Sequence, residues 1–291
     1  MSFIKKPQDV AGGIAVGADI YFHGKGEEAK QYPSEMLWIL YESKMDIIKK
    51  LLPPPLEPIE KPYVLAQIDN FKKCNFDTGI NGPGYMETAL FLPCRYKGSQ
   101  GIFTVGMNLN TDMAVFVGKD TWGYPKKYAN IKNHFLDGVN YTGFAERHGI
   151  PFFVVTAKLD GKPNDPNFVE EFASVMPFDP DHPGVGVNFT FKWTIGKNEP
   201  QLGKEEIFIH KPLLVKEWDA MHNVEEKIGS GNIHFTWSDD DPWAELEVVR
   251  VLGASLQTGE YVMMGPCEYE EVDEEEFLPY AFYGWDHSPI W

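Results

Sequence analysis

The spacing of strand-like segments constrains this fold most. Segments rich in branched and aromatic residues recur at short intervals through the 291 residues, separated by turns with glycine or proline. No helix pattern alternates with them, which argues against a doubly wound α/β fold. The sequence therefore predicts a mainly β (α+β) fold, an antiparallel β-barrel or closed sheet with a few short helices. The predicted strands are 35–42, 63–71, 84–96, 102–109, 129–135, 138–146, 150–159, 187–195, 205–214, 231–237, 245–252 and 260–268.

Three short helices are predicted between the strands. Ser43 is expected to cap a helix that runs to Leu52, where prolines 53–55 end it. Thr111 and Asp112 open a second short helix, which covers the run 112–118 and precedes the two lysines at 126 and 127. Apolar residues at helical spacing over 166–175 predict the third.

The chain is predicted to be a single domain over 1–291. Residues 1–34 are expected to form an extended N-terminal arm with one short strand near 18–22, and residues 268–291 an acidic and aromatic tail. The acidic stretch 268–276 is expected to be a solvated face, with the alternative that its aromatic residues pack on a partner subunit. The apolar end, 285–291, is expected to dock on the barrel or on a neighbour.

Composition limits the partners and the compartment. A net charge of −17 argues against nucleic acid or an anionic membrane as a partner. No apolar run is long enough to span a bilayer, and the N-terminus lacks a secretory signal, so a cytoplasmic location is expected. Cys74, Cys94 and Cys267 are sparse and the histidines never fall at ligand spacing, so neither a disulfide framework nor a metal site is expected.

Two adjacent lysines carry the clearest chemical signal. Lys126 and Lys127 directly follow Pro125 and lie among the aromatic residues Trp122, Tyr124 and Tyr128. A lysine becomes a nucleophile only as the neutral amine, which burial or a second cation favours. Two ammonium groups about 5 Å apart repel by roughly 3 kcal/mol at an effective dielectric constant of about 20. The pair is therefore a candidate for covalent chemistry, with a solvated surface pair as the alternative.

The run 114–127, which ends in Tyr-Pro-Lys-Lys, resembles the signature of the acetoacetate decarboxylase family. In that family the first lysine, here Lys126, forms a Schiff base with the substrate, and the second, here Lys127, is the cation that favours the neutral amine. Weaker matches at 43–56, 188–192 and 239–272 extend the resemblance over most of the chain. The resemblance implies an acetoacetate decarboxylase-like closed sheet, a homo-oligomer, and no cofactor, because the lysine itself is the electron sink.

Glu87 is the next candidate. Period-two alternation places it on one strand face with Tyr85, Ala89 and Phe91. A carboxylate on such a face is either a sign of a mis-phased strand edge or a buried acid. The resemblance favours the buried acid, because the decarboxylases keep a pocket glutamate there that can accept or donate a proton.

Two positions depart from the family pattern. Gln67 stands where the decarboxylases carry a second glutamate, and Ser34 stands where they carry an arginine. Both are candidates for substrate binding, and a glutamine can hold a carboxylate or hydroxyl as donor and acceptor. These changes put decarboxylation of acetoacetate itself in question.

The leading hypothesis is a lyase that forms a Schiff base between Lys126 and a small keto acid, most simply a β-keto acid decarboxylase. One alternative is an aldolase–dehydratase of the same superfamily that uses a pyruvate-type substrate. Another is a non-catalytic β-barrel that binds small molecules. A third is an interaction subunit that uses its acidic tail and carries an ordinary surface lysine pair.

Overall fold

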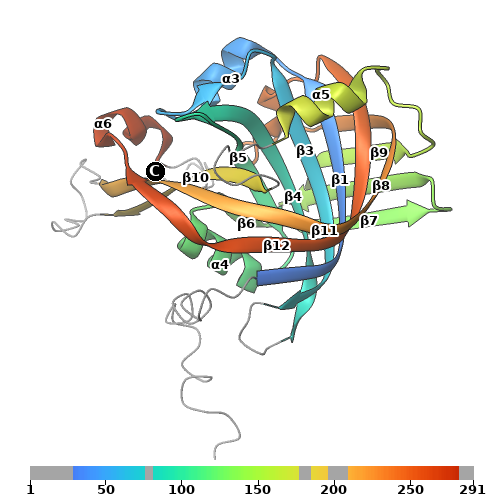
Figure 1. Cartoon of the computed structure of the whole chain (residues 1–291), viewed down its shortest axis with the longest axis horizontal. Helices are drawn as coiled ribbons and strands as arrows, with labels where there is room; N and C mark the ends of the chain where they lie inside the picture. Colours follow the sequence, from blue (N-terminus) through green and yellow to red (C-terminus); the bar gives the residue numbers. More distant parts are fainter. Residues whose placement is uncertain (1–28, 76–80, 177–184, 196–208, 282–291) are drawn as a thin grey trace, which may run out of the picture.

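The computed structural model describes residues 29–75, 81–176, 185–195 and 209–281, and strands dominate it (Figure 1). The strands are β1 (Ala29–Glu42), β2 (Glu57–Pro58), β3 (Tyr63–Asn75), β4 (Asn81–Tyr96), β5 (Ser99–Leu109), β6 (Lys126–Tyr128), β7 (Asn130–Leu136), β8 (Asn140–Arg147), β9 (Ile150–Lys158), β10 (Gly186–Ile195), β11 (Ile209–Phe235) and β12 (Arg250–Glu271). The helices are α3 (Met45–Leu51), α4 (Asp112–Trp122), α5 (Phe168–Val175) and α6 (Glu274–Phe277), with 3-10 turns η1 (Trp243–Glu245) and η2 (Leu278–Tyr280). None of these described helices is long and apolar enough to cross a membrane.

Strand β10 closes the main sheet. Neighbouring strands follow the order β10-β5-β4-β3-β1-β12-β11, and β10 also pairs with β11, so the hydrogen bonding returns to its first strand. The prediction of a mainly β, closed sheet is confirmed. It was wrong to make every pair antiparallel, because β10 and β6 each run parallel to β5. The chain leaves β5 at Leu109 and enters β10 at Gly186, which is far more than the dozen residues that a connection between parallel strands needs.

The two longest strands link the closed sheet to a second layer. β11 pairs with β12 as far as Gly229 and with β9 from Ser230 onward, and β8 and β7 extend that second layer. Within the described residues the predicted strand 205–214 belongs to β11, the predicted strand 231–237 ends two residues beyond β11, and 260–268 lies wholly inside β12. The predicted strand 245–252 begins too early, since 243–245 form η1. Charged and polar residues between the predicted strands hid this continuity, and pairing with β12 keeps them extended.

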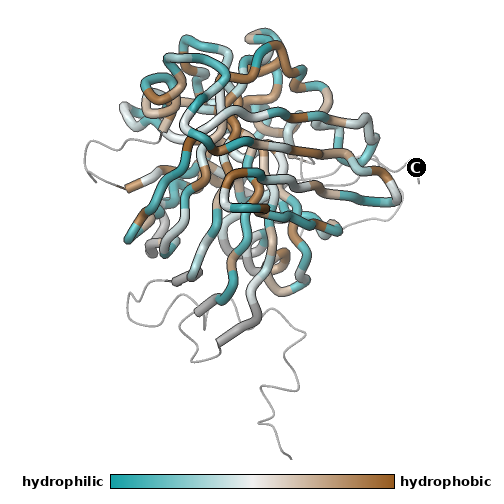
Figure 2. The backbone as a smooth tube through the Cα atoms, turned by 90° about the vertical axis from the view of Figure 1, so that its right-hand side faces the viewer, coloured by the Kyte–Doolittle hydropathy of each residue, from teal (hydrophilic) through white to brown (hydrophobic). Residues whose placement is uncertain are grey.

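Alternation along the inner strands separates two hydrophobic cores. On β3, Leu65 and Phe71 belong to the cluster inside the closed sheet, whereas Val64 and Ile68 belong to the cluster between the sheet and the second layer. Figure 2 shows hydrophobic and hydrophilic residues alternating along several strands. Alternate residues of such a strand therefore pack in the outer core, and the residues between them face the interior of the closed sheet.

The helices differ from the prediction at their ends. The prediction that Ser43 caps α3 is wrong: the cap position is Lys44, and Ser43 is buried with its backbone N–H donating to the Pro62 carbonyl oxygen at 2.8 Å. Helix α4 continues past Gly118 to Trp122 and ends at Gly123, whose φ of 76° is left-handed. The helix predicted over 166–175 is confirmed as α5.

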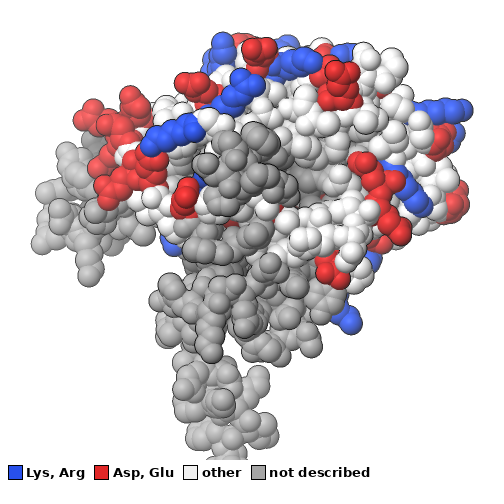
Figure 3. Space-filling view, viewed as in Figure 1, with Lys and Arg blue, Asp and Glu red and all other residues white. Residues whose placement is uncertain are grey.

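The two predicted tails are shorter than expected. Residues 29–34 belong to β1 and 268–271 to β12, because both segments gain strand partners; residues 18–22 and 285–291 lie outside the described part. The acidic side chains of 268–276 are exposed, and acidic residues gather near α6 in Figure 3. At the end of α6, Phe277 is buried and stacks on Phe191 with ring centroids 4.9 Å apart.

Gly229 provides a test of the link between the two layers. A Cβ there would lie 1.9 Å from the carbonyl oxygen of Lys158, a backbone atom of β9 that cannot swing away. We expect Gly229→Ala to lower the free energy of unfolding by about 1–3 kcal/mol, the usual loss on overpacking. Urea denaturation measures this loss. Gly231→Ala is the matched control, since its nearest contact would be 3.1 Å, and a loss as large in the control would contradict this explanation.

Candidate active site

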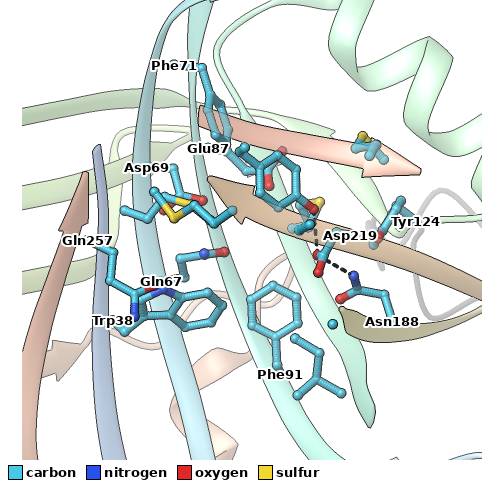
Figure 4. Close-up of a pocket in the computed structure, with 18 of the residues that line it drawn as sticks. Trp38, Gln67, Asp69, Phe71, Glu87, Phe91, Tyr124, Asn188, Asp219 and Gln257 are labelled. Atoms are coloured by element: carbon cyan, nitrogen blue, oxygen red, sulfur yellow. Dashed lines mark hydrogen bonds between the residues drawn. The ribbon is translucent and has the colours of Figure 1, made fainter. Parts of the chain in front are cut away.

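A cavity of about 480 Å³ lies inside the closed sheet. Residues from all the strands of the closed sheet line it, together with β6, and eleven of the 23 lining residues are aromatic or methionine. Its polar lining is concentrated in a few groups, which Figure 4 shows in part. They are Gln67, Asp69, Glu87, Tyr124, Lys126, Asn188, Asp219, Gln257 and Tyr261.

Lys126 is the only lysine or arginine in this described lining, and it is 7% exposed. Its Nζ lies 3.3 Å from Oε2 of Glu87 and 5.2 Å from the ring centroid of Tyr124. The parallel pairing of β6 with β5, Lys126 opposite Met107, aims the side chain inward. The interpretation of the lysine pair as an ordinary surface pair therefore does not describe Lys126.

Gly118 leaves room for the amine. A Cβ at this position of α4 would lie 2.4 Å from Cε and 2.7 Å from Nζ of Lys126. The helix therefore packs directly on the end of the lysine side chain, and only a residue without a side chain permits this approach. The close approach of the Gly118 backbone to the Lys126 side chain therefore helps to fix the position of the amine.

Lys127 points to a different place. Its Nζ donates to the carbonyl oxygen of Asp240 and lies 3.8 Å from Oδ1 of Asp241, in a second cavity that Lys126 does not line. Asp241 is buried and also accepts hydrogen bonds from Arg147 at 2.8 Å and Asn108 at 3.1 Å. Successive residues of a strand face opposite sides, so β6 sends the two amines apart. The activating role expected for Lys127 requires its charge beside Lys126, and the structure instead places that charge against Asp241.

Carboxyl groups crowd one wall of the cavity. Glu87 on β4 stands directly opposite Asp69 on β3, and Figure 4 shows the two side chains together. Burial, with a contribution from the charge of Glu87, raises the pKa of Asp69 well above its ordinary value. Asp69 is fully buried, and neither carboxyl oxygen has a hydrogen-bond partner among the described residues. These surroundings favour the neutral, protonated form of Asp69, because an unpaired buried carboxylate is very unfavourable.

Strand β11 carries a second pair of buried acids, of which Asp219 lines the cavity. Asp219 accepts hydrogen bonds from Tyr261 and Asn188, both at 2.7 Å, and burial raises its pKa even though both bonds lower it. Glu217 accepts a hydrogen bond from the hydroxyl of Tyr124. Burial raises the pKa of Glu217 to about 8, against the lowering effect of that bond. Tyr124 therefore contacts both groups: its hydroxyl donates to Glu217, and the face of its ring lies under the Lys126 amine.

The predicted site residues separate into two groups. Lys126, Glu87 and Gln67 all line the cavity, which is where the sequence hypothesis needs them. Lys127 and Ser34 do not line the cavity. Ser34 is buried in β1, where it pairs with Phe71 of β3 and Gly259 of β12. The face that carries Glu87 also carries Tyr85, Ala89 and Phe91, as the alternation predicted, and all of them are buried in the interior.

Sequence reasoning missed Asp69, Glu217 and Asp219. Asp69 was within reach, because it lies two residues after Gln67 and period two puts both on one face. Glu217 and Asp219 gave no such signal, since they lie in a charged stretch beyond the predicted end of a strand. In the described part of the chain, no group of three or more His, Cys, Asp or Glu residues is placed to hold a metal ion.

The fold and the site together define a closed-sheet protein with a buried lysine–glutamate pair facing an apolar cavity. The sequence profile of the acetoacetate decarboxylase family matches residues 21–269. The chain belongs to the acetoacetate decarboxylase family, whose enzymes are lyases.

Individual relatives fit this assignment. The chain is 25% identical over 252 residues to a protein of Lactiplantibacillus plantarum named CLA biosynthesis isomerase, an alignment that covers 84% of each. It is 35% identical over 95 residues to the acetoacetate decarboxylase of Burkholderia mallei, covering 33% of this chain and 36% of that protein.

Solved structures share the fold. The acetoacetate decarboxylase of Legionella pneumophila superposes with a TM-score of 0.66 at 19% identity, over 84% of this chain and 88% of that one. The enduracididine biosynthesis enzyme MppR, complexed with pyruvate, superposes with a TM-score of 0.61 at 16% identity, over 86% of this chain and 92% of that one.

Gly118→Ala tests the packing of α4 on the lysine. The new methyl group should displace the flexible end of Lys126 and lengthen its contact with Glu87 beyond the 3.3 Å seen here. Folding should be preserved, because alanine favours a helix over glycine by about 1 kcal/mol. A crystal structure and a thermal melt check both points. Phe116→Ala on the exposed face of α4 should leave the contact intact, and an unmoved Lys126 in Gly118→Ala would contradict the packing argument.

Glu217 should make stability depend on pH. Its pKa rises from an ordinary value of 4.5 to about 8 on folding, so between these values the folded protein holds a proton that the unfolded chain has released. The free energy of unfolding should therefore fall as pH rises from about 5 to about 8. Glu217→Gln should weaken this fall, measured by urea denaturation at both ends of the range. The exposed Glu225→Gln is the control, and an unchanged slope in Glu217→Gln would contradict the assignment.

Proposed function

We propose that this protein is a lyase that forms a Schiff base between Lys126 and a β-keto acid and releases CO2. The observation that supports this most is the buried amine of Lys126, held 3.3 Å from Glu87 in an apolar cavity of a member of the acetoacetate decarboxylase family.

The chemistry uses the residues as follows. The Lys126 ammonium gives a proton to Glu87, and the neutral amine attacks the substrate ketone. Loss of water, with return of that proton, leaves a protonated imine. The bond to the carboxylate then breaks, its electron pair moves toward the imine nitrogen, and CO2 departs. The enamine takes a proton at carbon, and water releases the ketone and regenerates the lysine. Overall one proton is consumed and no cofactor takes part.

The charge of the cavity favours decarboxylation over chemistry that retains the carboxylate. Lys126 is the one cation in the described lining, and it contacts Glu87, so no second cation there neutralises a substrate carboxylate. Loss of CO2 as a neutral molecule removes that charge. A pyruvate aldolase must keep its substrate carboxylate through the whole cycle. Such surroundings therefore speed the first reaction more than the second.

An aldolase–dehydratase remains the second candidate. Gln67 replaces the family's second glutamate, and the structural neighbour MppR is complexed with pyruvate. Both reactions begin with the same imine on Lys126, so they differ only in the bond that breaks next. The products distinguish them.

The size of the cavity supports a substrate larger than acetoacetate. About 480 Å³ falls within the range of pockets that enclose drug-sized ligands, whereas acetoacetate is a four-carbon acid. Apolar side chains such as Trp38, Phe91 and Ile102 line the space beyond the polar groups. A β-keto acid with an added apolar chain would fill that space.

Borohydride trapping tests the proposal. Acetoacetate, 3-oxohexanoate and pyruvate are each added with borohydride, the adduct is located by peptide mass spectrometry, and CO2 is measured without borohydride. We expect an adduct on Lys126, CO2 release, and at least tenfold tighter half-saturation for 3-oxohexanoate than for acetoacetate, since each buried CH2 contributes about 0.8 kcal/mol.

The controls define failure. Lys126→Ala should abolish the adduct, and Lys132→Gln, a change to an exposed lysine of β7, should preserve it. A pyruvate adduct without CO2 from either β-keto acid would favour the aldolase–dehydratase. No adduct on Lys126 with any of the three acids would leave a non-catalytic binding protein.

A further inference from the structure

Two buried donors in the cavity wall have no acceptor. The indole Nε1–H of Trp38 has no hydrogen-bond partner among the described residues, and neither has the carboxyl group of Asp69. Both residues line the cavity, and Asp69 is wholly buried. A buried donor without a partner costs about 1–3 kcal/mol, so two in one wall point to a ligand that brings acceptor atoms.

These donors come from neighbouring strands. Trp38 on β1 stands directly opposite Gln67 on β3, and Asp69 follows two residues later on the same face of β3. Gln67 also lines the cavity, and its amide adds a third neutral donor between the other two. Figure 4 shows Trp38, Gln67 and Asp69 along one wall, with Glu87 next to Asp69.

The charge of Asp69 decides what this wall can bind. Burial and the neighbouring Glu87 raise the pKa of Asp69 well above its ordinary value, and the absence of a partner for either carboxyl oxygen among the described residues also favours the protonated group, which has a hydroxyl hydrogen to donate. A neutral acid donates to an anion, whereas a carboxylate would repel it. Hydrogen bonds from such donors to a carboxylate are charge-assisted and stronger than bonds between neutral groups.

We propose that Trp38 and Asp69, with Gln67 between them, receive the carboxylate of the substrate through neutral donors rather than through a cation. This inference rests on the proposed function of Lys126. Asp69 stands directly opposite Glu87 on the neighbouring strand, and Glu87 contacts the amine of Lys126. The donor wall is therefore next to the residue that holds the reacting amine. Neutral donors orient the carboxylate without placing a second full positive charge beside it.

The test separates recognition of the carboxylate from formation of the Schiff base. Trapping on Lys126 is measured against concentration for 3-oxohexanoate and for 2-pentanone, the ketone that remains after that acid loses CO2. Trp38→Phe and Asp69→Leu should each raise the half-saturating concentration of 3-oxohexanoate about tenfold or more, and that of 2-pentanone by less than about twofold. Asp69→Asn should stay close to the unchanged protein, because its amide still donates.

Hexanoate provides a second readout that needs no imine. Calorimetric binding of hexanoate should weaken in Trp38→Phe and Asp69→Leu and persist in Asp69→Asn. The surface variant Asp160→Asn, a change to a residue paired with Lys158, should match the unchanged protein in every assay. Thermal melts confirm folding, and the two strands provide independent variants if one fails to fold.

The outcomes are distinct. Equal weakening of 3-oxohexanoate and 2-pentanone would overturn the proposal, since it would make Trp38 and Asp69 general packing residues. Asp69→Asn as impaired as Asp69→Leu would also overturn it, because a proton rather than a donor would then be required. Hexanoate binding that weakens only in Trp38→Phe and Asp69→Leu, without any adduct on Lys126, would support the donor wall and contradict the proposed Schiff base.

Discussion

The double pairing of β10 is the constraint on which the rest of this structure depends. By joining β5 in parallel and β11 antiparallel, β10 turns an open sheet into a closed one and gives the inward-facing residues of every strand a shared interior. The outward-facing residues meet β7, β8 and β9, so the outer hydrophobic core is built on the other side of the same strands. The interior is thus free to hold a cavity with polar groups.

The adjacent lysines divide two tasks between two faces of β6. Lys126 enters the cavity, where Gly118 and Glu87 set the position of its amine. Lys127 joins Asn108 and Arg147 around the buried Asp241, which fastens β6 to its surroundings. These contacts lie on the face of β6 opposite to Lys126 and hold the short strand in place. The environment of the Lys126 amine itself is formed by Glu87, Tyr124 and Gly118.

Several buried acids lie in or near the cavity, and burial favours their neutral forms. The surroundings of Asp69 favour the protonated group that can donate, and Glu217, whose pKa rises to about 8, accepts a hydrogen bond from Tyr124. A site that looks repulsive to a keto acid from its formal charges becomes one that offers hydrogen-bond donors. The protonation states follow from the enclosure, which is a property of the closed sheet and of no single residue.

The sequence by itself determined the mainly β character, most strand positions, the lysine motif and the inward face of Glu87, because these depend on local spacing and on short-range backbone preferences. Only the tertiary structure decided that two pairs of predicted strands are the continuous β11 and β12, that β10 runs parallel to β5, and that Ser34 stays outside the cavity. It also decided the separation of Lys127 from Lys126 and the burial that raises the pKa of Asp69. Pairing, burial and pKa depend on residues far apart in the chain, and local sequence carries no record of which distant groups will meet.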